Sequence, residues 1–329
     1  MSLTDGRILG APPLPTSPEL LDQVSTEQHA LLTRRHCLTA GMSDKAIRWR
    51  LDRGWWVAVH HGVYLTQPGR DDWHTRAVAA QLAVPDSAWS HRSAGFVHGL
   101  VRSAPATIEL VVGAGRRIDP PDGVVVRRRR RVDQAVDPLH WPWRTTAAET
   151  ILDIAGSSDA DELFALLGRA FQRRLTSEDE IRAALAVRRA YRWRHLLAVV
   201  LADVAEGAES AMEVRYVNDV ERAHGLPGGI RQMASPSSTS QRHDIGYLDQ
   251  RVVVELDGRL GHEGREERVR DGVRDRRGAT VGWLTVRAFW IDVAVRPCAL
   301  AVDVGAVLGT RGWRDQPHPC RRRGCCVGG

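Results

Sequence analysis

The stretch that most constrains the fold of this chain lies near its C-terminal end. Residues 242–247 read RHDIGY, a short turn follows, and residues 252–258 read VVVELDG. The apolar, β-branched start of the second segment predicts a buried strand, yet that strand ends in two carboxylates. Because side chains alternate along a strand, Glu255 and Asp257 should project from one face, and an antiparallel hairpin partner should carry Asp244 close to both.

Three acids gathered in this way require a cation. Like charges so close together cannot all stay ionised in a dry site without one, and hard oxygen ligands favour Mg²⁺ or Mn²⁺ over zinc. The sequence therefore predicts a metal site in which Asp244 and Glu255 are the ligands and Asp257 completes or supports the site. The alternative for Asp257, which precedes Gly258, is plain turn chemistry.

The composition is that of a basic globular protein. Its 329 residues allow two or three domains, and the formal net charge of +6 fits a polyanionic partner. No apolar run has membrane-spanning length, and the N-terminus has no signal-peptide pattern, so we expect a cytoplasmic protein without membrane contact. The five cysteines form no disulfide framework, which fits a reducing compartment.

Composition shifts and periodicity divide the chain into five segments of a mixed α/β (α+β) protein. They are a disordered lead (1–17), a winged helix-turn-helix (18–68), an α/β middle segment (69–195), a C-terminal α/β domain (196–310) and a basic, Cys-containing tail (311–329). The C-terminal domain should run helix, hairpin, charged helix, strand and helix.

The N-terminal pattern predicts three short helices followed by a hairpin. The second helix is capped by Thr33, the third is capped by Ser43, and strand-like pieces fill residues 55–65. In a winged helix the third helix enters the major groove of DNA. The candidate DNA contacts there are four basic residues, Lys45, Arg48, Arg50 and Arg53. The aromatic Trp49 lies between them in the sequence. The alternative is a solvated basic helix in a protein-interaction module.

The middle segment carries a run of five arginines from Arg127 to Arg131. One interpretation makes Arg127 and Arg129 part of a phosphate-binding stripe, and the other makes the run a solvated strand end. Thr146 and Glu149 have the spacing of a helix capping box. Ser90 and His91 have the residue types of a nucleophile and its base, but no third partner is evident.

The C-terminal domain resembles the DUF559 branch of the PD-(D/E)XK nuclease superfamily, which is related to very-short-patch-repair endonucleases. The resemblance covers roughly residues 205–308 and rests on Ser210-Ala211-Met212-Glu213, Asp244, Val254-Glu255-Leu256-Asp257-Gly258, His262, Arg274-Asp275, Gly282-Trp283 and Val286-Arg287. The N-terminal part, through Ser90-His91-Arg92-Ser93-Ala94 and His98-Gly99-Leu100, is similar to the winged helix of AbiEi-type antitoxins.

The nuclease resemblance implies a restriction-endonuclease-like mixed sheet flanked by helices, and Mg²⁺-dependent hydrolysis of DNA phosphodiesters. Asp244 and Glu255 match the metal-binding acids, and Glu213 matches the helix acid, although Ser210 and Glu213 also have capping-box spacing. The superfamily's lysine is replaced by Asp257, and the chain's single lysine, Lys45, lies in another domain.

Repair-type members use histidine in place of that lysine, so the resemblance makes His262 the substitute; the alternative is a solvated loop residue. The antitoxin resemblance implies a second function, a transcriptional repressor with a cognate toxin and an inactive nuclease fold. The tail adds four possible zinc ligands whose spacing fits no standard finger, and its composition favours disorder. These are His318, Cys320, Cys325 and Cys326.

Overall fold

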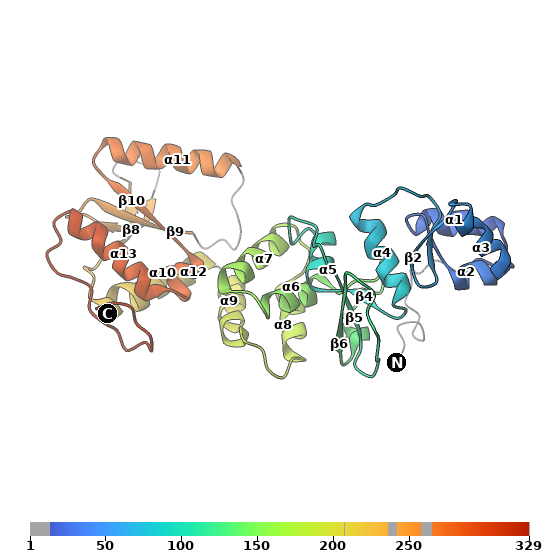
Figure 1. Ribbon diagram of the computed structural model, residues 1–329. Coiled ribbons are helices and arrows are strands. Elements are labelled where there is room, and N and C mark those ends of the chain that lie inside the picture. The colour runs from blue at the N-terminus through green and yellow to red at the C-terminus, as the bar shows by residue number, and fades with distance from the viewer. Residues whose placement is uncertain (1–13, 207, 236–241, 258–264, 329) are drawn as a thin grey trace. The chain divides into compact units, whose positions relative to one another are not determined.

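The computed structural model describes residues 14–206, 208–235, 242–257 and 265–328. The chain forms two compact units. The first unit comprises the residues up to Ser157 together with Leu175–Arg188, and the second comprises Ser158–Arg174 and Arg189–Gly329. Helices and mixed sheets alternate in both, which confirms the predicted α/β class (Figure 1). Within the described ranges, no helix is both long and apolar enough to cross a bilayer.

The first unit begins with a winged helix. Its elements are α1 (Glu19–Glu27), β1 (Leu31–Thr33), α2 (Arg34–Thr39), α3 (Asp44–Asp52), β2 (Val57–His60) and β3 (Val63–Leu65). The strands form an antiparallel sheet in the order β1-β3-β2. The predicted caps are confirmed: the Thr33 hydroxyl accepts from the His36 N–H at 3.1 Å, and the Ser43 hydroxyl accepts from the Ala46 N–H at 3.2 Å. Strand β1, between the first two helices, was not predicted.

His36 makes the winged helix sensitive to acid. Its ring is buried, and its Nδ1 accepts a hydrogen bond from the Thr33 N–H at 3.2 Å. Burial, with help from the Arg35 charge, lowers the pKa of His36 to about 4. The unfolded chain binds this proton near pH ~6.5, so the folded state loses stability as pH falls from there towards 4.

We therefore expect His36 to cost the first unit about 2 kcal/mol of stability between pH 7 and pH 5. The variant His36→Gln should lack this loss, because glutamine completes the same capping box without titrating. Urea unfolding of both proteins at the two pH values measures the difference. Equal pH dependence of wild type and variant would contradict the assignment.

The rest of the first unit packs helices around a small sheet. Its elements are α4 (Trp73–Ala83), β4 (Ala88–Trp89), α5 (His91–Val97), β5 (Ile108–Gly113), β6 (Val124–Arg129), a 3₁₀ turn (Val132–Gln134), α6 (Ala147–Ala155) and α8 (Glu178–Ala186). Strand β5 lies between β4, which is antiparallel to it, and β6, which is parallel. Trp89 is buried in the core and its Nε1–H donates to the Ala77 carbonyl at 3.0 Å.

The second unit is built on a four-stranded mixed sheet. Its elements are α7 (Ala160–Gln172), α9 (Arg194–Glu206), α10 (Ala208–Arg215), a π-helical segment η2 (Tyr216–Arg222), β7 (Ile230–Ala234), β8 (Arg242–Tyr247), β9 (Val252–Asp257), α11 (Arg265–Thr280), β10 (Leu284–Phe289), α12 (Trp290–Ala294) and α13 (Pro297–Thr310). The order is β10-β9-β8-β7, with β9 and β10 parallel and the other pairs antiparallel. Figure 1 shows the sheet between α11 and the helices α10, α12 and α13.

The hairpin of β8 and β9, the charged helix, the third strand and the last helix agree with the sequence prediction. Strand β7 was not predicted, and it extends the sheet beyond β8. Residues 311–328, expected to form a disordered tail, instead fold back on this unit: the His318 N–H donates to the His224 carbonyl at 3.0 Å, and Val327 is buried.

Candidate functional site

The two acids that anchor the predicted metal site lie on adjacent antiparallel strands, Asp244 on β8 and Glu255 on β9. The paired ladder of this hairpin ends at Ile245 and Val254. Beyond this point Asp244 Oδ2 accepts a hydrogen bond from the Leu256 N–H at 2.7 Å. The carboxylate of Asp244 therefore replaces a backbone carbonyl as the acceptor. The carboxylate is thus fixed at the point where the two strands cease to pair.

Glu255 is held by His243, a residue to which no role was assigned from the sequence. Its Oε1 contacts Nδ1 of His243, and His243 Nε2 lies 3.1 Å from the hydroxyl of Ser235. One tautomer satisfies both contacts: Nδ1–H donates to the carboxylate and Nε2 accepts from the hydroxyl. His243 is buried, and a buried imidazole needs such partners. This burial cannot be read from the sequence, so the sequence carried no signal for the role of His243.

Two of the other predicted members of the site lie on β9 and α10. Asp257 is the last residue of β9 and is partly buried. Glu213 lies on α10, where its carboxylate accepts a hydrogen bond from Gln232 on β7. Because α10 begins at Ala208, Ser210 is inside the helix, so the capping-box interpretation of Glu213 is wrong. His262 lies outside the described residues.

The expected convergence of three carboxylates is not observed. Among the residues that the structure describes, the one cluster of three or more His, Cys, Asp or Glu side chains close enough to hold a metal ion lies elsewhere in the second unit. The reason is visible in the contacts, since the Asp244 carboxylate is directed to the N–H of Leu256 and that of Glu255 to His243.

Two acids nevertheless fit a hard divalent cation. Carboxylate oxygens are the ligands that Mg²⁺ and Mn²⁺ prefer, and Mg²⁺ commonly uses one or two carboxylates and keeps several waters. Metal-binding carboxylates are also oriented by hydrogen-bond donors, as Asp244 and Glu255 are here. The residues present therefore suit a site with Asp244 and Glu255 as ligands.

A basic residue stands beside Glu255 in the sheet. Arg287 on β10 is its partner in the parallel ladder. The Arg287 guanidinium is engaged by α11, with Nε 3.2 Å from Asp275 Oδ2 and Nη2 3.1 Å from Asp275 Oδ1. This ion pair holds the charged helix on the sheet, so Arg287 is not simply the missing lysine in another position.

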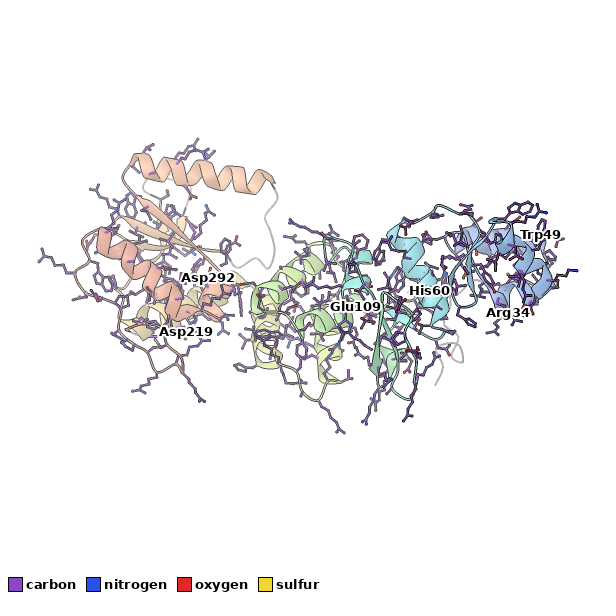
Figure 2. All side chains as sticks on the ribbon, viewed as in Figure 1. Arg34, Trp49, His60, Glu109, Asp219 and Asp292 are labelled. Atoms are coloured by element: carbon purple, nitrogen blue, oxygen red, sulfur yellow. The ribbon has the colours of Figure 1, made fainter. Side chains whose placement is uncertain are left out.

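The third helix of the winged helix presents charge and aromatic surface together. Lys45, Arg48 and Arg53 are exposed, as predicted for residues that contact DNA. Trp49 lies on the surface of α3 and is 44% exposed (Figure 2). It packs edge-on against Trp55, which is 57% exposed, with ring centroids 4.7 Å apart. The Arg53 guanidinium lies 5.6 Å from the Trp49 ring centroid.

Arg50 differs from the other basic residues of α3. It is partly buried, its Nη1–H donates to the Ala46 carbonyl at 3.2 Å, and its guanidinium lies over the Trp56 ring at 5.3 Å. These contacts tie Arg50 to α3 and to the start of the wing, which is the hairpin of β2 and β3. Its predicted contact with DNA therefore competes with an internal role.

Two arginines of the run form ion pairs within the first unit. Arg127 pairs with Glu109 at 3.2 Å, and Arg129 pairs with Glu149 at 2.6 Å and with Asp153 at 3.4 Å. The two residues predicted to bind phosphate are thus the two that the protein uses internally. Arg127 is nevertheless exposed, and the exposed arginines of the run that have no acidic partner among the described residues are Arg128, Arg130 and Arg131.

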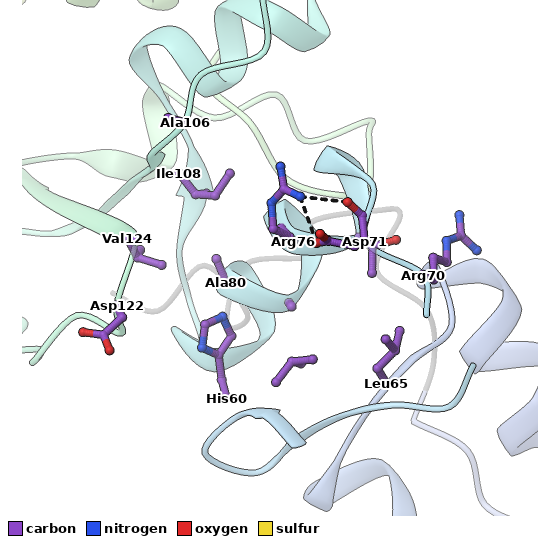
Figure 3. Close-up of a pocket in the computed structure, with 14 residues that line it drawn as sticks. His60, Leu65, Arg70, Asp71, Arg76, Ala80, Ala106, Ile108, Asp122 and Val124 are labelled. Carbon is purple, nitrogen blue, oxygen red and sulfur yellow. Dashed lines mark hydrogen bonds and ion pairs between the residues drawn. The ribbon is translucent and has the colours of Figure 1, made fainter. Parts of the chain in front are cut away.

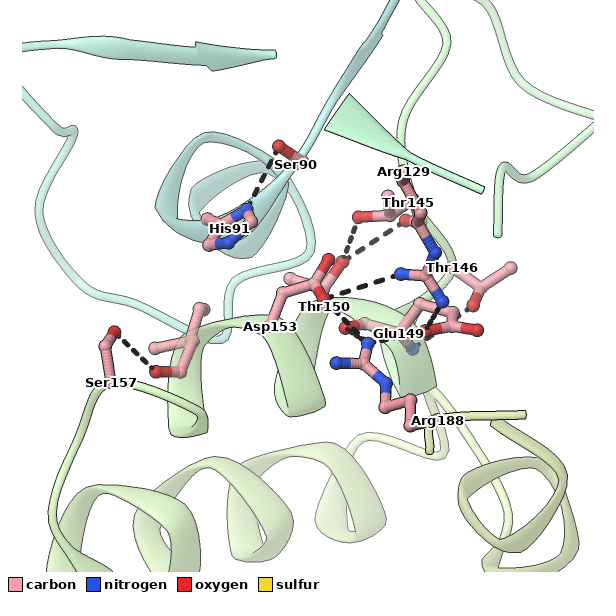
Figure 4. A network of polar contacts seen from close by, with 11 residues as sticks. Ser90, His91, Arg129, Thr145, Thr146, Glu149, Thr150, Asp153, Ser157 and Arg188 are labelled. Carbon is pink, nitrogen blue, oxygen red and sulfur yellow. Dashed lines mark hydrogen bonds and ion pairs between the residues drawn. The ribbon is translucent and has the colours of Figure 1, made fainter. Parts of the chain in front are cut away.

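Arg129 belongs to a buried ion network (Figure 4). Arg188, just after α8, contacts Glu149 Oε2 at 2.7 Å and Asp153 Oδ1 at 2.6 Å. Burial lowers the pKa of Arg188, but the two carboxylates outweigh burial and raise it overall. The predicted capping box of α6 is half formed: the Thr146 hydroxyl accepts from the Glu149 N–H at 3.3 Å. The Glu149 carboxylate is engaged in the ion network instead of returning to Thr146.

Ser90 and His91 lie beside this network. His91 Nδ1 is 3.1 Å from the Ser90 hydroxyl, but the Ser90 side chain is fully buried. A hydroxyl without exposed surface cannot meet a substrate, so this pair is structural. His91 also adopts a left-handed backbone conformation, with φ of 46°.

A pocket of ≈ 300 Å³ lies in the first unit, beside the wing and β6 (Figure 3). It is lined by His60, Ile108, Asp122 and the acidic and basic residues that precede or begin α4. Both arginines of the lining are paired, since Arg76 Nη1 lies 2.9 Å from Asp71 Oδ1 and Arg70 Nε lies 2.9 Å from Oδ2 of the adjacent Asp72.

Comparison with known proteins leaves the family open. No known family model matches the chain, and no curated protein matches it. Among solved structures, the chain is similar to the Rv2827c protein from Mycobacterium tuberculosis, with 19% identity and a TM-score of 0.36 over 61% of this chain and 83% of that one.

Proposed function

We propose that this protein binds DNA through its winged helix and hydrolyses DNA phosphodiesters in its second unit with Mg²⁺ or Mn²⁺. The observation that supports this most is the pair of oriented acids, Asp244 and Glu255, where two antiparallel strands of a helix-flanked mixed sheet stop pairing. Partly buried carboxylates that are held in fixed orientations are suited to binding a metal ion.

A bound ion would supply a metal-activated water and offset the charge that develops on the phosphorane. Asp244 and Glu255 hold it, and the Leu256 N–H and His243 keep these carboxylates in place. Glu213 lies on the adjoining helix and is oriented by Gln232. In this proposal Asp257 supports the site and His262 transfers the proton. Both roles are taken from the family resemblance.

DNA binding is assigned to α3, with the wing against the backbone or minor groove. The exposed cations of α3 neutralise phosphates, and the exposed indole of Trp49, packed against Trp55, offers an apolar surface between them. Arg128, Arg130 and Arg131 are the competing surface in the same unit.

Neutralising Lys45, Arg48 and Arg53 to glutamine should weaken duplex binding and flatten its salt dependence. Each lost phosphate contact should remove about 0.9 units of the log–log slope. Titrations of a fluorescent duplex at several salt concentrations measure this. The matched control neutralises Arg128, Arg130 and Arg131; if that variant loses the slope and the α3 variant does not, the arginine run is the DNA surface.

A second candidate function is a transcriptional repressor of antitoxin type, in which the nuclease fold only binds. It is favoured by Asp257 at the lysine position and by the absence of a three-acid cluster among the described residues. Its partners would be its operator and a cognate toxin. Plasmid nicking by the purified chain with Mg²⁺ or Mn²⁺ separates the two functions.

A further inference from the structure

Four side chains from three separate parts of the second unit meet at one point. They are His224, Cys298, Cys320 and Cys325, and their ligand atoms all lie within 4.8 Å of one another. His224 follows η2, Cys298 is the second residue of α13, and the other two belong to residues 311–328. Three thiols and an imidazole make one of the standard donor sets of a structural zinc site.

His224 is arranged as a metal-binding histidine is. Its side chain is fully buried, and Nδ1 lies 2.9 Å from the carbonyl oxygen of His318, so Nδ1 carries the proton and donates it. The lone pair is then on Nε2, which is buried and has no hydrogen-bond partner in the described structure. An uncompensated buried nitrogen is costly, and a metal ion in the cluster satisfies it.

The thiols have the spacing and donors that a zinc site requires. Cys298 Sγ and Cys320 Sγ are 3.7 Å apart, which is too far for a disulfide. Two sulfurs on one tetrahedral zinc, each at about 2.3 Å, lie about 3.8 Å apart. Backbone N–H groups two residues later also point at two of the sulfurs, Arg322 at Cys320 (3.4 Å) and Val327 at Cys325.

We propose that His224, Cys298, Cys320 and Cys325 bind one Zn²⁺ ion, which fastens residues 311–328 to α13 and to the end of η2. Soft thiolates select zinc over Mg²⁺, and four protein ligands leave no open position, so the role is structural. Three thiolates and Zn²⁺ leave one negative charge, which the neighbouring Arg321–Arg323 run offsets.

The site is independent of the nuclease proposal, and so is its test. The full chain, purified under reducing conditions without chelator, should contain about one zinc per chain by inductively coupled plasma mass spectrometry. Cys325→Ser should lower the zinc content severalfold. Cys326→Ser, which changes the exposed neighbouring thiol, and Cys37→Ser, which changes a thiol of the first unit, should keep it.

A second measurement guards against misfolding of the variants. Zinc removed from the wild type by a chelator should lower the melting temperature, and Co²⁺ added back should restore it and give the intense visible bands of tetrahedral cobalt. If the reduced wild type binds neither zinc nor cobalt, the proposal is overturned. Zinc retained by Cys325→Ser, or lost equally from Cys326→Ser, would overturn the assignment as well.

Discussion

Glu255→Ala should lower metal-dependent DNA cleavage by about 10³-fold, because a lost metal ligand removes several kcal/mol of transition-state stabilisation. Duplex affinity should survive, since α3 belongs to the other unit. Nicking of supercoiled plasmid in Mg²⁺, followed over time on agarose gels, measures the rate.

The matched control is Asp249→Ala, which removes an exposed carboxylate from the turn of the same hairpin. It should cleave at the wild-type rate. Cleavage by Glu255→Ala at the same rate as Asp249→Ala would move the active site away from β9. Loss of cleavage in both would point to damage of the hairpin instead of loss of a ligand.

Arg129→Ala should destabilise the first unit by about 3–5 kcal/mol, because it leaves Glu149 and Asp153 buried with one cation in place of two. Arg127→Ala, two residues earlier on the same strand, should cost less than about 1 kcal/mol, since the Arg127 side chain is half exposed. Urea unfolding followed by tryptophan fluorescence compares them. Equal losses would show that the buried network contributes no more than a surface pair.

Elements with strong local signals were predictable from the sequence. Thr33 and Ser43 both cap helices, because a hydroxyl one residue before a helix satisfies its free N–H groups whatever the tertiary context. The β8–β9 hairpin follows from a β-branched run and a short turn. The two-residue β4 is too short to show a pattern, and β7 shows no regular apolar–polar alternation; each is placed by pairing with a neighbouring strand.

The side-chain partners in the candidate site were less predictable. The sequence places Asp244 and Glu255 on neighbouring strands, but it does not show that the ladder ends before them or that His243 holds Glu255. Arg129 looks like its neighbours in the run until α6 supplies two buried acids. These pairings join residues distant in the chain, and local periodicity carries no information about them.

The cysteine cluster shows the same limit. The tail alone suggested His318, Cys320, Cys325 and Cys326 as zinc ligands, yet His318 contacts His224 through its backbone N–H and carbonyl, and Cys326 is exposed. The missing ligands, His224 and Cys298, come from helices far away in the sequence. A metal site assembled by tertiary packing has no fixed spacing to recognise.

Hydrolysis of DNA by the second unit is tested by cleavage with the purified wild-type chain. Supercoiled plasmid and labelled single-stranded, duplex and mismatched substrates are incubated with Mg²⁺, Mn²⁺ or EDTA. We predict cleavage of at least one substrate with either metal and none in EDTA. Tight DNA binding without cleavage of any substrate under either metal would contradict the nuclease proposal and support the repressor.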